Sequence, residues 1–94
     1  AMGQRVLLVD SDLRLPTLHE RLELDNTFGL STAISNDLAL ELIVQTSLIE
    51  SNLSILTAGQ VPPDPTKLLS SRKMHNLMER FKETYDLIIY DMPP

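Results

Sequence analysis

Three short segments of the chain are apolar at most positions, and longer segments with polar faces separate them. The apolar segments are residues 6–9, 53–58 and 87–90. Continuous apolar runs of this length are typical of strands buried on both faces of a parallel sheet, and the intervals between them are long enough for crossover helices. We therefore expect an α/β fold of three layers, in which a parallel sheet with strand order 2-1-3 is flanked by helices.

Helical patterns occupy the intervals between these strands. Apolar residues three and four apart predict an amphipathic helix that includes residues 74–81. Asp64 followed by Pro65 is typical of a helix start just before it, because an N-cap acceptor precedes proline at the first helical position. Shorter helices are predicted at residues 17–24, 30–35 and 38–45, with Asp37 as the expected N-cap of the last one.

Acidic residues follow two of the predicted strands. Asp10 and Asp12 come after the first strand, and Asp91 comes after the third. Ligands of open α/β sheets bind beyond the carboxyl ends of the strands, where the strand order reverses, so these side chains should converge. Three close carboxylates repel one another unless they share a cation, and Mg²⁺ prefers a few hard oxygen ligands together with water and phosphate. The pattern predicts a magnesium site.

The composition of the chain limits the classes of function that it can have. The 94 residues suffice for one small domain, and a net charge of −5 without a basic run gives no reason to expect a nucleic-acid partner. The chain has no cysteine and no apolar run long enough to cross a membrane, so we expect a cytoplasmic protein. It also lacks the G-x-x-x-x-G-K-[ST] pattern that cradles a triphosphate.

Two motifs and several shorter ones carry a family resemblance. The first strand leads to Asp10-x-Asp12-x-Arg14, and the third leads to Asp91-x-Pro93-Pro94. Between them lie Leu18-His19, Gly29-Leu30-Ser31, Ala58-Gly59 and the proline-rich segment 63–71. In this order and spacing the chain resembles the bacterial tyrosine autokinases of capsular, exopolysaccharide and lipopolysaccharide biosynthesis and export. These kinases belong to the P-loop class and carry a deviant Walker A′ motif before Walker B.

The resemblance implies a role for each motif residue. Asp10 corresponds to the carboxylate proposed to accept the tyrosine hydroxyl proton, Asp12 and Asp91 to groups that hold Mg²⁺, and Arg14 to a contact of the nucleotide phosphates. The residue types also fit simpler interpretations, in which Asp12 caps a turn and Arg14 neutralises the nearby carboxylates. Leu15 and Lys67 depart from the family pattern, which often has arginine and an acidic residue there.

The resemblance also implies an incomplete domain. Residues 1–94 would form the central part of a kinase domain, without the P-loop strand and the C-terminal segment. The intact parent would use ATP and Mg²⁺, lie at the inner face of the plasma membrane, and assemble with other copies of itself and with a membrane-spanning activator. This fragment would be inactive and bind no cofactor. Strand 87–90 would then be an uncovered edge, through which we expect the fragment to self-associate.

Two other functions remain open on the sequence. One is a positioning ATPase for plasmid partition or the division site, although such proteins more often carry glutamine at the position of Arg14. The other is a non-catalytic regulatory module whose parent has no P-loop.

Overall fold

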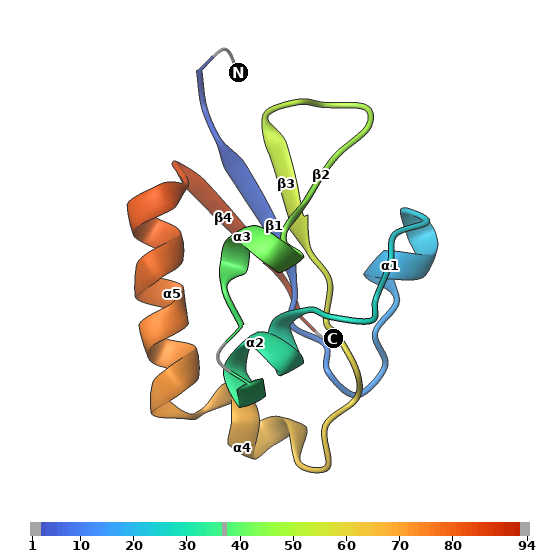
Figure 1. Ribbon diagram of the computed structural model, residues 1–94, viewed down its shortest axis with the longest axis vertical. Helices are drawn as coiled ribbons and strands as arrows, with labels where there is room; N and C mark the ends of the chain where they lie inside the picture. Colours follow the sequence, from blue (N-terminus) through green and yellow to red (C-terminus); the bar gives the residue numbers. More distant parts are fainter. Residues whose placement is uncertain (1–2, 37, 93–94) are drawn as a thin grey trace.

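The computed structural model describes residues 3–36 and 38–92. The strands in this part of the chain are β1 (Val6–Asp10), β2 (Gln45–Thr46), β3 (Leu53–Leu56) and β4 (Leu87–Asp91). The helices are α1 (Leu18–Arg21), α2 (Leu30–Asn36), α3 (Leu40–Ile43), α4 (Pro65–Leu69) and α5 (Arg72–Thr84). Figure 1 shows the strands side by side, with α5 running alongside β4.

The strands form one sheet in the order β2-β3-β1-β4. Both neighbours of β1 are parallel to it, so the predicted order of the three apolar strands is confirmed, with β1 in the centre. The sheet also contains β2, which pairs antiparallel with β3 and was not predicted.

The predicted helix 38–45 is wrong at its C-terminal end. Helix α3 ends at Ile43, because the backbone of Val44 is extended with ψ 132° and Gln45 already pairs with Ile55 of β3. Tertiary pairing with a neighbouring strand therefore overrides the local helical pattern. Asp37, the expected cap of this helix, lies outside the described residues.

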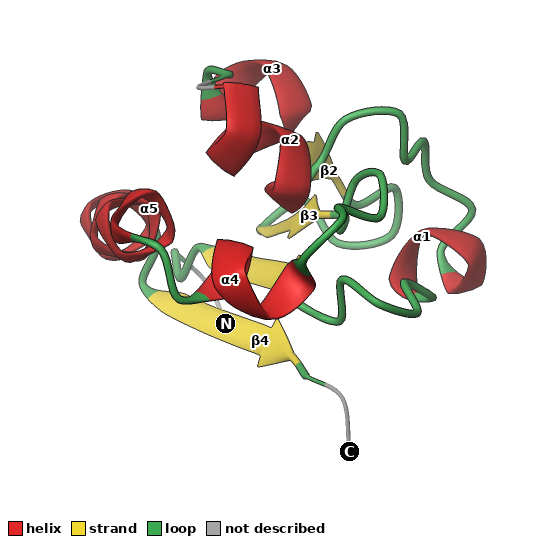
Figure 2. Ribbon diagram, turned by 90° about the horizontal axis from the view of Figure 1, so that it is seen from below, coloured by secondary structure: helices red, strands yellow, loops and turns green. Residues whose placement is uncertain are grey.

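One face of the sheet carries the hydrophobic core. Leu7 and Val9 of β1 and Leu56 of β3 are fully buried there. Helices α2, α3 and α5 cover this face (Figure 2), and they contribute Leu30, Ile34, Leu40, Ile43, Met74, Leu77 and Phe81 to the same cluster. Tyr90 of β4 packs beside Phe81, with 6.5 Å between the ring centroids.

The other face of the sheet is thinly covered. Only the short helix α1 lies on that side among the described helices (Figure 2). Leu87 and Ile89 alternate with the inward-facing residues of β4, and their side chains are 44% and 46% exposed. The second helical layer of the expected three-layer fold therefore consists of a single turn of helix.

Side-chain caps define the helices that lead to β4. Asp64 accepts a hydrogen bond from the Lys67 amide at the start of α4, which confirms the predicted cap. Ser71 does the same for Met74 at the start of α5. Each cap satisfies a backbone N–H that has no partner within its own helix.

A close backbone junction joins α2 to the end of β3. Gly29 lies so near this segment that a Cβ atom there would collide with the Thr57 carbonyl oxygen and the Gly59 amide nitrogen. The Asn26 side chain accepts from the Gly59 N–H at 2.8 Å and donates to its carbonyl oxygen at 3.0 Å. The motifs Gly29-Leu30-Ser31 and Ala58-Gly59 thus have a shared structural reason, which is the contact between their backbones.

Candidate functional site at the carboxyl ends of β1 and β4

Asp10 and Asp91 lie side by side at the same edge of the sheet. They are register partners at the carboxyl ends of the parallel strands β1 and β4. The next residue, Ser11, donates hydrogen bonds from its amide and from its hydroxyl to the Asp91 carbonyl oxygen, each at 3.0 Å. The predicted convergence of the two motifs is thus observed for Asp10 and Asp91. Ser11 was not predicted as a linking residue, and its position between two aspartates was the only hint in the sequence.

Asp10 is fully buried, with a relative exposure of 0%. Its Oδ1 accepts from the Asp12 amide at 3.1 Å and its Oδ2 from the Leu18 amide at 3.2 Å. Burial raises the pKa of the Asp10 carboxyl above its usual value of 3.8, and the nearby Asp91 charge acts in the same direction. Hydrogen bonds from the backbone N–H groups of Asp12, Leu18 and Thr17 oppose this rise in pKa but do not cancel it. Asp10 therefore anchors the start of α1 and holds its proton more readily than an exposed aspartate.

Asp12 is half-buried, and its side chain contacts the backbone of the loop that follows it. Its Oδ1 accepts a hydrogen bond from the Leu15 amide at 3.2 Å, so the turn-capping interpretation is confirmed. Its Oδ2, like both carboxylate oxygens of Asp91, has no hydrogen-bond partner among the described residues. Within residues 3–36 and 38–92, no three acidic, histidine or cysteine side chains form a ready-made metal cluster.

The side chain of Arg14 contacts helix α4. Its Nη2 donates to the Thr66 hydroxyl of α4 at 3.2 Å, and in the described part of the chain it forms no ion pair with Asp10 or Asp12. The neutralising role considered for Arg14 is therefore not observed here. Thr66 was not singled out in the sequence, because nothing in its local pattern indicates a partner 52 residues away.

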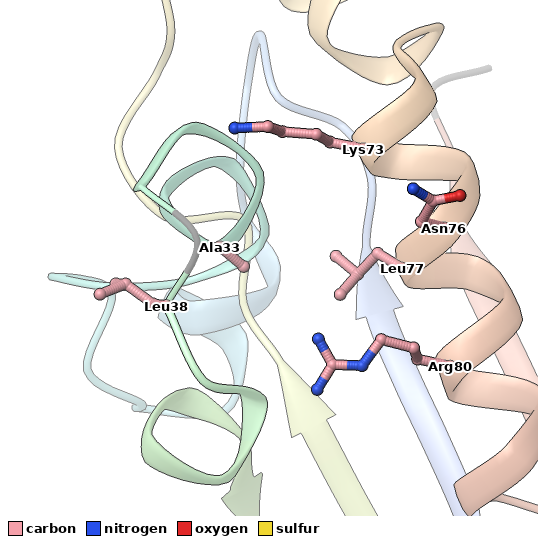
Figure 3. A pocket seen from close by; sticks show the side chains of 6 residues that line it. All are labelled: Ala33, Leu38, Lys73, Asn76, Leu77 and Arg80. Atoms are coloured by element: carbon pink, nitrogen blue, oxygen red, sulfur yellow. The ribbon is translucent and has the colours of Figure 1, made fainter.

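A separate hollow lies on the helix-covered side of the sheet (Figure 3). It has a volume of about 180 Å³ between α5 and α2. Lys73, Asn76 and Arg80 extend from α5 over a floor that includes Leu77 and Ala33. No carboxylate lines it among the described residues, so it offers none of the hard oxygen ligands that Mg²⁺ requires. The aspartate motifs remain the candidate site.

The sequence and the fold of the chain are similar to those of bacterial tyrosine-protein kinases. The chain is 44% identical over 92 residues to the tyrosine-protein kinase YwqD of Bacillus subtilis, a match that covers 98% of this chain and 38% of YwqD. The structure of the chimerical protein CapA2B2 superposes with a TM-score of 0.92 at 37% identity, covering 98% of this chain and 40% of that one. The kinase domain of Escherichia coli ETK superposes at 0.88 with 36% identity, covering 97% and 35%. The resemblance to the bacterial tyrosine kinases is confirmed. No protein-family model matches the chain.

A related ATPase shares the fold at lower similarity. The septum site-determining protein MinD of Pyrococcus horikoshii, solved with Mg-ADP, superposes with a TM-score of 0.74 at 30% identity, covering 98% of this chain and 37% of that one. The chain spans about two fifths of the length of the first curated relatives that it matches. Among the described residues, no helix has both the length and the apolar character to cross a bilayer.

Proposed function

We propose that this chain is the central part, from Walker A′ to Walker B, of the kinase domain of an ATP-dependent protein-tyrosine kinase. The observation that carries the proposal is the pairing of Asp10 with Asp91 at the carboxyl edge of the sheet, in a chain whose sequence is 44% identical to that of YwqD over 92 residues. In the parent, a P-loop strand and a C-terminal segment outside residues 1–94 would complete the nucleotide site. The biological role would be control of capsular, exopolysaccharide or lipopolysaccharide biosynthesis, since the relatives include a kinase encoded in a cps region.

Asp12 and Asp91 are the residues that would hold Mg²⁺ in the parent. Each keeps at least one carboxylate oxygen without a hydrogen-bond partner in the described part of the chain, and the two residues lie on adjoining elements. Mg²⁺ usually binds one or two protein carboxylates and completes its shell with water and substrate phosphates, so two such ligands fit it better than a closed protein cage. Bound there, the ion would neutralise charge on the phosphates of ATP.

Asp10 is the proposed acceptor of the tyrosine hydroxyl proton. Its raised pKa favours proton uptake, and each of its oxygens keeps one lone pair beyond the N–H that it already accepts. Because the side chain is fully buried, a tyrosine hydroxyl reaches it only if the segment between β1 and α1 moves aside. Arg14, which is exposed and held by a single hydroxyl contact, would turn toward the nucleotide phosphates.

The parent would work in an assembly at the membrane. We propose that it meets other copies of itself, whose tyrosines it phosphorylates, and a membrane-spanning activator at the inner face of the plasma membrane. The chimerical CapA2B2 structure supports a partner protein for the relatives. The likeness to MinD supports a positioning ATPase as the second candidate function.

A domain exchange tests the proposal. This chain replaces the matching stretch of YwqD, which supplies the rest of a tyrosine-protein kinase, and phosphotyrosine is measured with Mg·ATP. We expect the exchanged protein to phosphorylate tyrosine. Asp10→Asn should lower the rate of phosphorylation at least about a hundredfold and leave the ATP affinity nearly unchanged, since a proton acceptor acts mainly in the transition state. Lys82→Gln, at an exposed position of α5, is the matched control and should remain active.

The possible results separate the alternatives. ATP hydrolysis without phosphotyrosine would favour the positioning ATPase, and a folded exchange protein without either activity would favour a regulatory module. Equal losses of ATP affinity and phosphorylation in Asp10→Asn would assign Asp10 to nucleotide binding instead.

A further inference from the structure

The hollow beside α5 carries positive charge in an acidic chain. Lys73 and Arg80 line it, about two helical turns apart, and no carboxylate lines it among the described residues. The chain as a whole has 8 Lys and Arg residues against 13 Asp and Glu residues. The walls of the hollow are helices α2 and α5 and the side chain of Leu38 (Figure 3). The local charge is therefore opposite to that of the whole molecule and complements an anion.

The polar groups of this hollow are mainly hydrogen-bond donors. The Lys73 ammonium and the Arg80 guanidinium can only donate, and the Asn76 amide adds two further donors beside its oxygen. The Arg80 side chain is exposed, and its guanidinium has no hydrogen bond or ion pair within the described part of the chain. In Figure 3 it extends from α5 across the hollow. A ligand that fits these donors carries an anionic group rich in acceptors.

The floor and the size of the hollow select the rest of the ligand. Ala33 and Leu77 form a buried apolar floor, with Leu38 at its side. The volume of about 180 Å³ is below the roughly 300–1,000 Å³ of pockets that enclose drug-sized ligands, so the hollow suits one side chain and not a whole nucleotide. Phosphotyrosine combines an apolar ring with a phosphate, whereas phosphoserine and phosphothreonine have the phosphate without a ring.

We propose that this hollow binds a phosphotyrosine side chain, with its ring over Leu77 and its phosphate on the Arg80 guanidinium. The phosphate has a charge of about −1.5 to −2 at pH 7 and three acceptor oxygens, and a guanidinium binds two such oxygens side by side. Lys73 supplies the second positive charge. The origin of the phosphotyrosine rests on the proposed function, because a tyrosine kinase would produce it on other copies of the protein. The hollow would then hold phosphorylated copies together.

Two carboxylates compete with the phosphate for Arg80. Glu41 and Glu83 line a neighbouring hollow of about 130 Å³, which also includes Arg80. Glu83 lies three residues after Arg80 on α5, a spacing at which side chains on a helix can meet. In the structure, neither carboxylate forms an ion pair with Arg80. Glu83 should therefore weaken phosphate binding, since it attracts the guanidinium and repels the phosphate.

Titration with N-acetyl-phosphotyrosine amide, followed by NMR of the backbone amides, tests the site. We expect saturable shifts centred on Leu77 and Arg80 of α5. N-acetyl-tyrosine amide lacks the charge and the phosphoserine counterpart lacks the ring, so each should bind at least about tenfold more weakly. Equal binding of the phosphoserine probe would overturn the ring position over Leu77, and the absence of saturable shifts in α5 would overturn the site.

Three substitutions at exposed positions of α5 locate the phosphate. Arg80→Gln should weaken phosphotyrosine binding at least about tenfold. Arg72→Gln removes the same charge outside the hollow and should leave binding nearly unchanged. Glu83→Gln should tighten binding about twofold or more, a gain that a misfolded variant would not produce. Equal losses in both arginine variants would indicate general charge attraction and reject the site, as would weaker binding by Glu83→Gln.

These measurements separate the site from the kinase activity. None of them uses ATP or measures phosphorylation, so phosphotyrosine binding can fail while the domain exchange with YwqD succeeds. Binding to the hollow together with an inactive exchange protein would keep the site and reject the proposed function alone.

Discussion

The fold shifts the pKa values of Asp10 and Asp25 in opposite directions. Burial is the largest cause of the raised pKa of Asp10. Asp25 is on the surface, where the hydroxyl and the amide of Thr27 both donate to its Oδ1 and lower its pKa. The contrast shows that desolvation outweighs backbone hydrogen bonds at Asp10, whereas hydrogen bonds decide the pKa at Asp25.

These opposite shifts predict the order in which the two groups titrate. In a carboxyl-detected NMR titration, we expect Asp10 to titrate above pH 3.8 and Asp25 below it. Thr27→Val removes one donor and should bring the pKa of Asp25 back toward 3.8 without moving that of Asp10. A pKa of Asp10 at or below 3.8 would contradict its burial in solution.

The raised pKa of Asp10 also predicts how stability depends on pH. The folded state binds the Asp10 proton more tightly than the unfolded chain, so the stabilisation is complete below pH 3.8 and is lost as the pH rises through the raised pKa. Asp10→Asn does not titrate at this position. In urea unfolding, the free energy of unfolding of the native chain should therefore fall relative to that of Asp10→Asn as the pH rises above 3.8. A constant difference would contradict the shift.

At the scale of elements, the junction between α2 and β3 positions the loop that leads to α4. The amides of Leu30 and Ser31 donate to the carbonyl oxygens of Thr57 and Ala58, both at 2.8 Å, and the Ser31 hydroxyl donates to the Gln60 carbonyl at 2.6 Å. Helix α4, which follows this loop, presents Thr66 to Arg14. Packing at the carboxyl end of β3 thus helps to decide where Arg14 is held.

Gly29→Ala should disrupt this junction. The added methyl group would overlap backbone atoms that cannot rotate away, and forcing extra volume into a packed site typically costs about 1–3 kcal/mol. We expect a loss of this size in the free energy of chemical unfolding. Ser35→Ala, at an exposed position of α2, should change stability by less than about 0.5 kcal/mol. Equal stability of Gly29→Ala and the native chain would mean that the junction opens in solution.

At the scale of the whole molecule, the candidate site has carboxylates for a metal ion but lacks a phosphate cradle. The G-x-x-x-x-G-K-[ST] pattern is absent from the 94 residues, and no other part of the sequence combines a glycine-rich turn with such a lysine. Asp12 and Asp91 would therefore interact with the nucleotide only through a metal ion.

The isolated chain should not bind Mg·ATP, because it lacks a phosphate cradle. We expect calorimetry to show no saturable binding at tens of micromolar protein, because the groups that hold the β and γ phosphates are missing. YwqD provides the positive control under the same conditions. A dissociation constant in the low micromolar range would show that a phosphate site exists elsewhere in the chain.

The sequence by itself determined the three parallel strands of the sheet, which helix is amphipathic, and that Asp10 and Asp91 end neighbouring strands. These features depend on local periodicity and on the parallel crossover rule, which are readable along the chain. The kinase interpretation was also available from the sequence, because each family motif is a short contiguous run of residues.

The tertiary structure alone decided the contacts between segments far apart in sequence. Residues Gln45–Thr46 form a strand because they pair with β3. Arg14 donates a hydrogen bond to Thr66, and Asp10 is buried where it accepts from the Leu18 amide at the start of α1. The physical reason is the same in each case: hydrogen-bond partners and burial depend on which segments meet in space, and local sequence does not encode that.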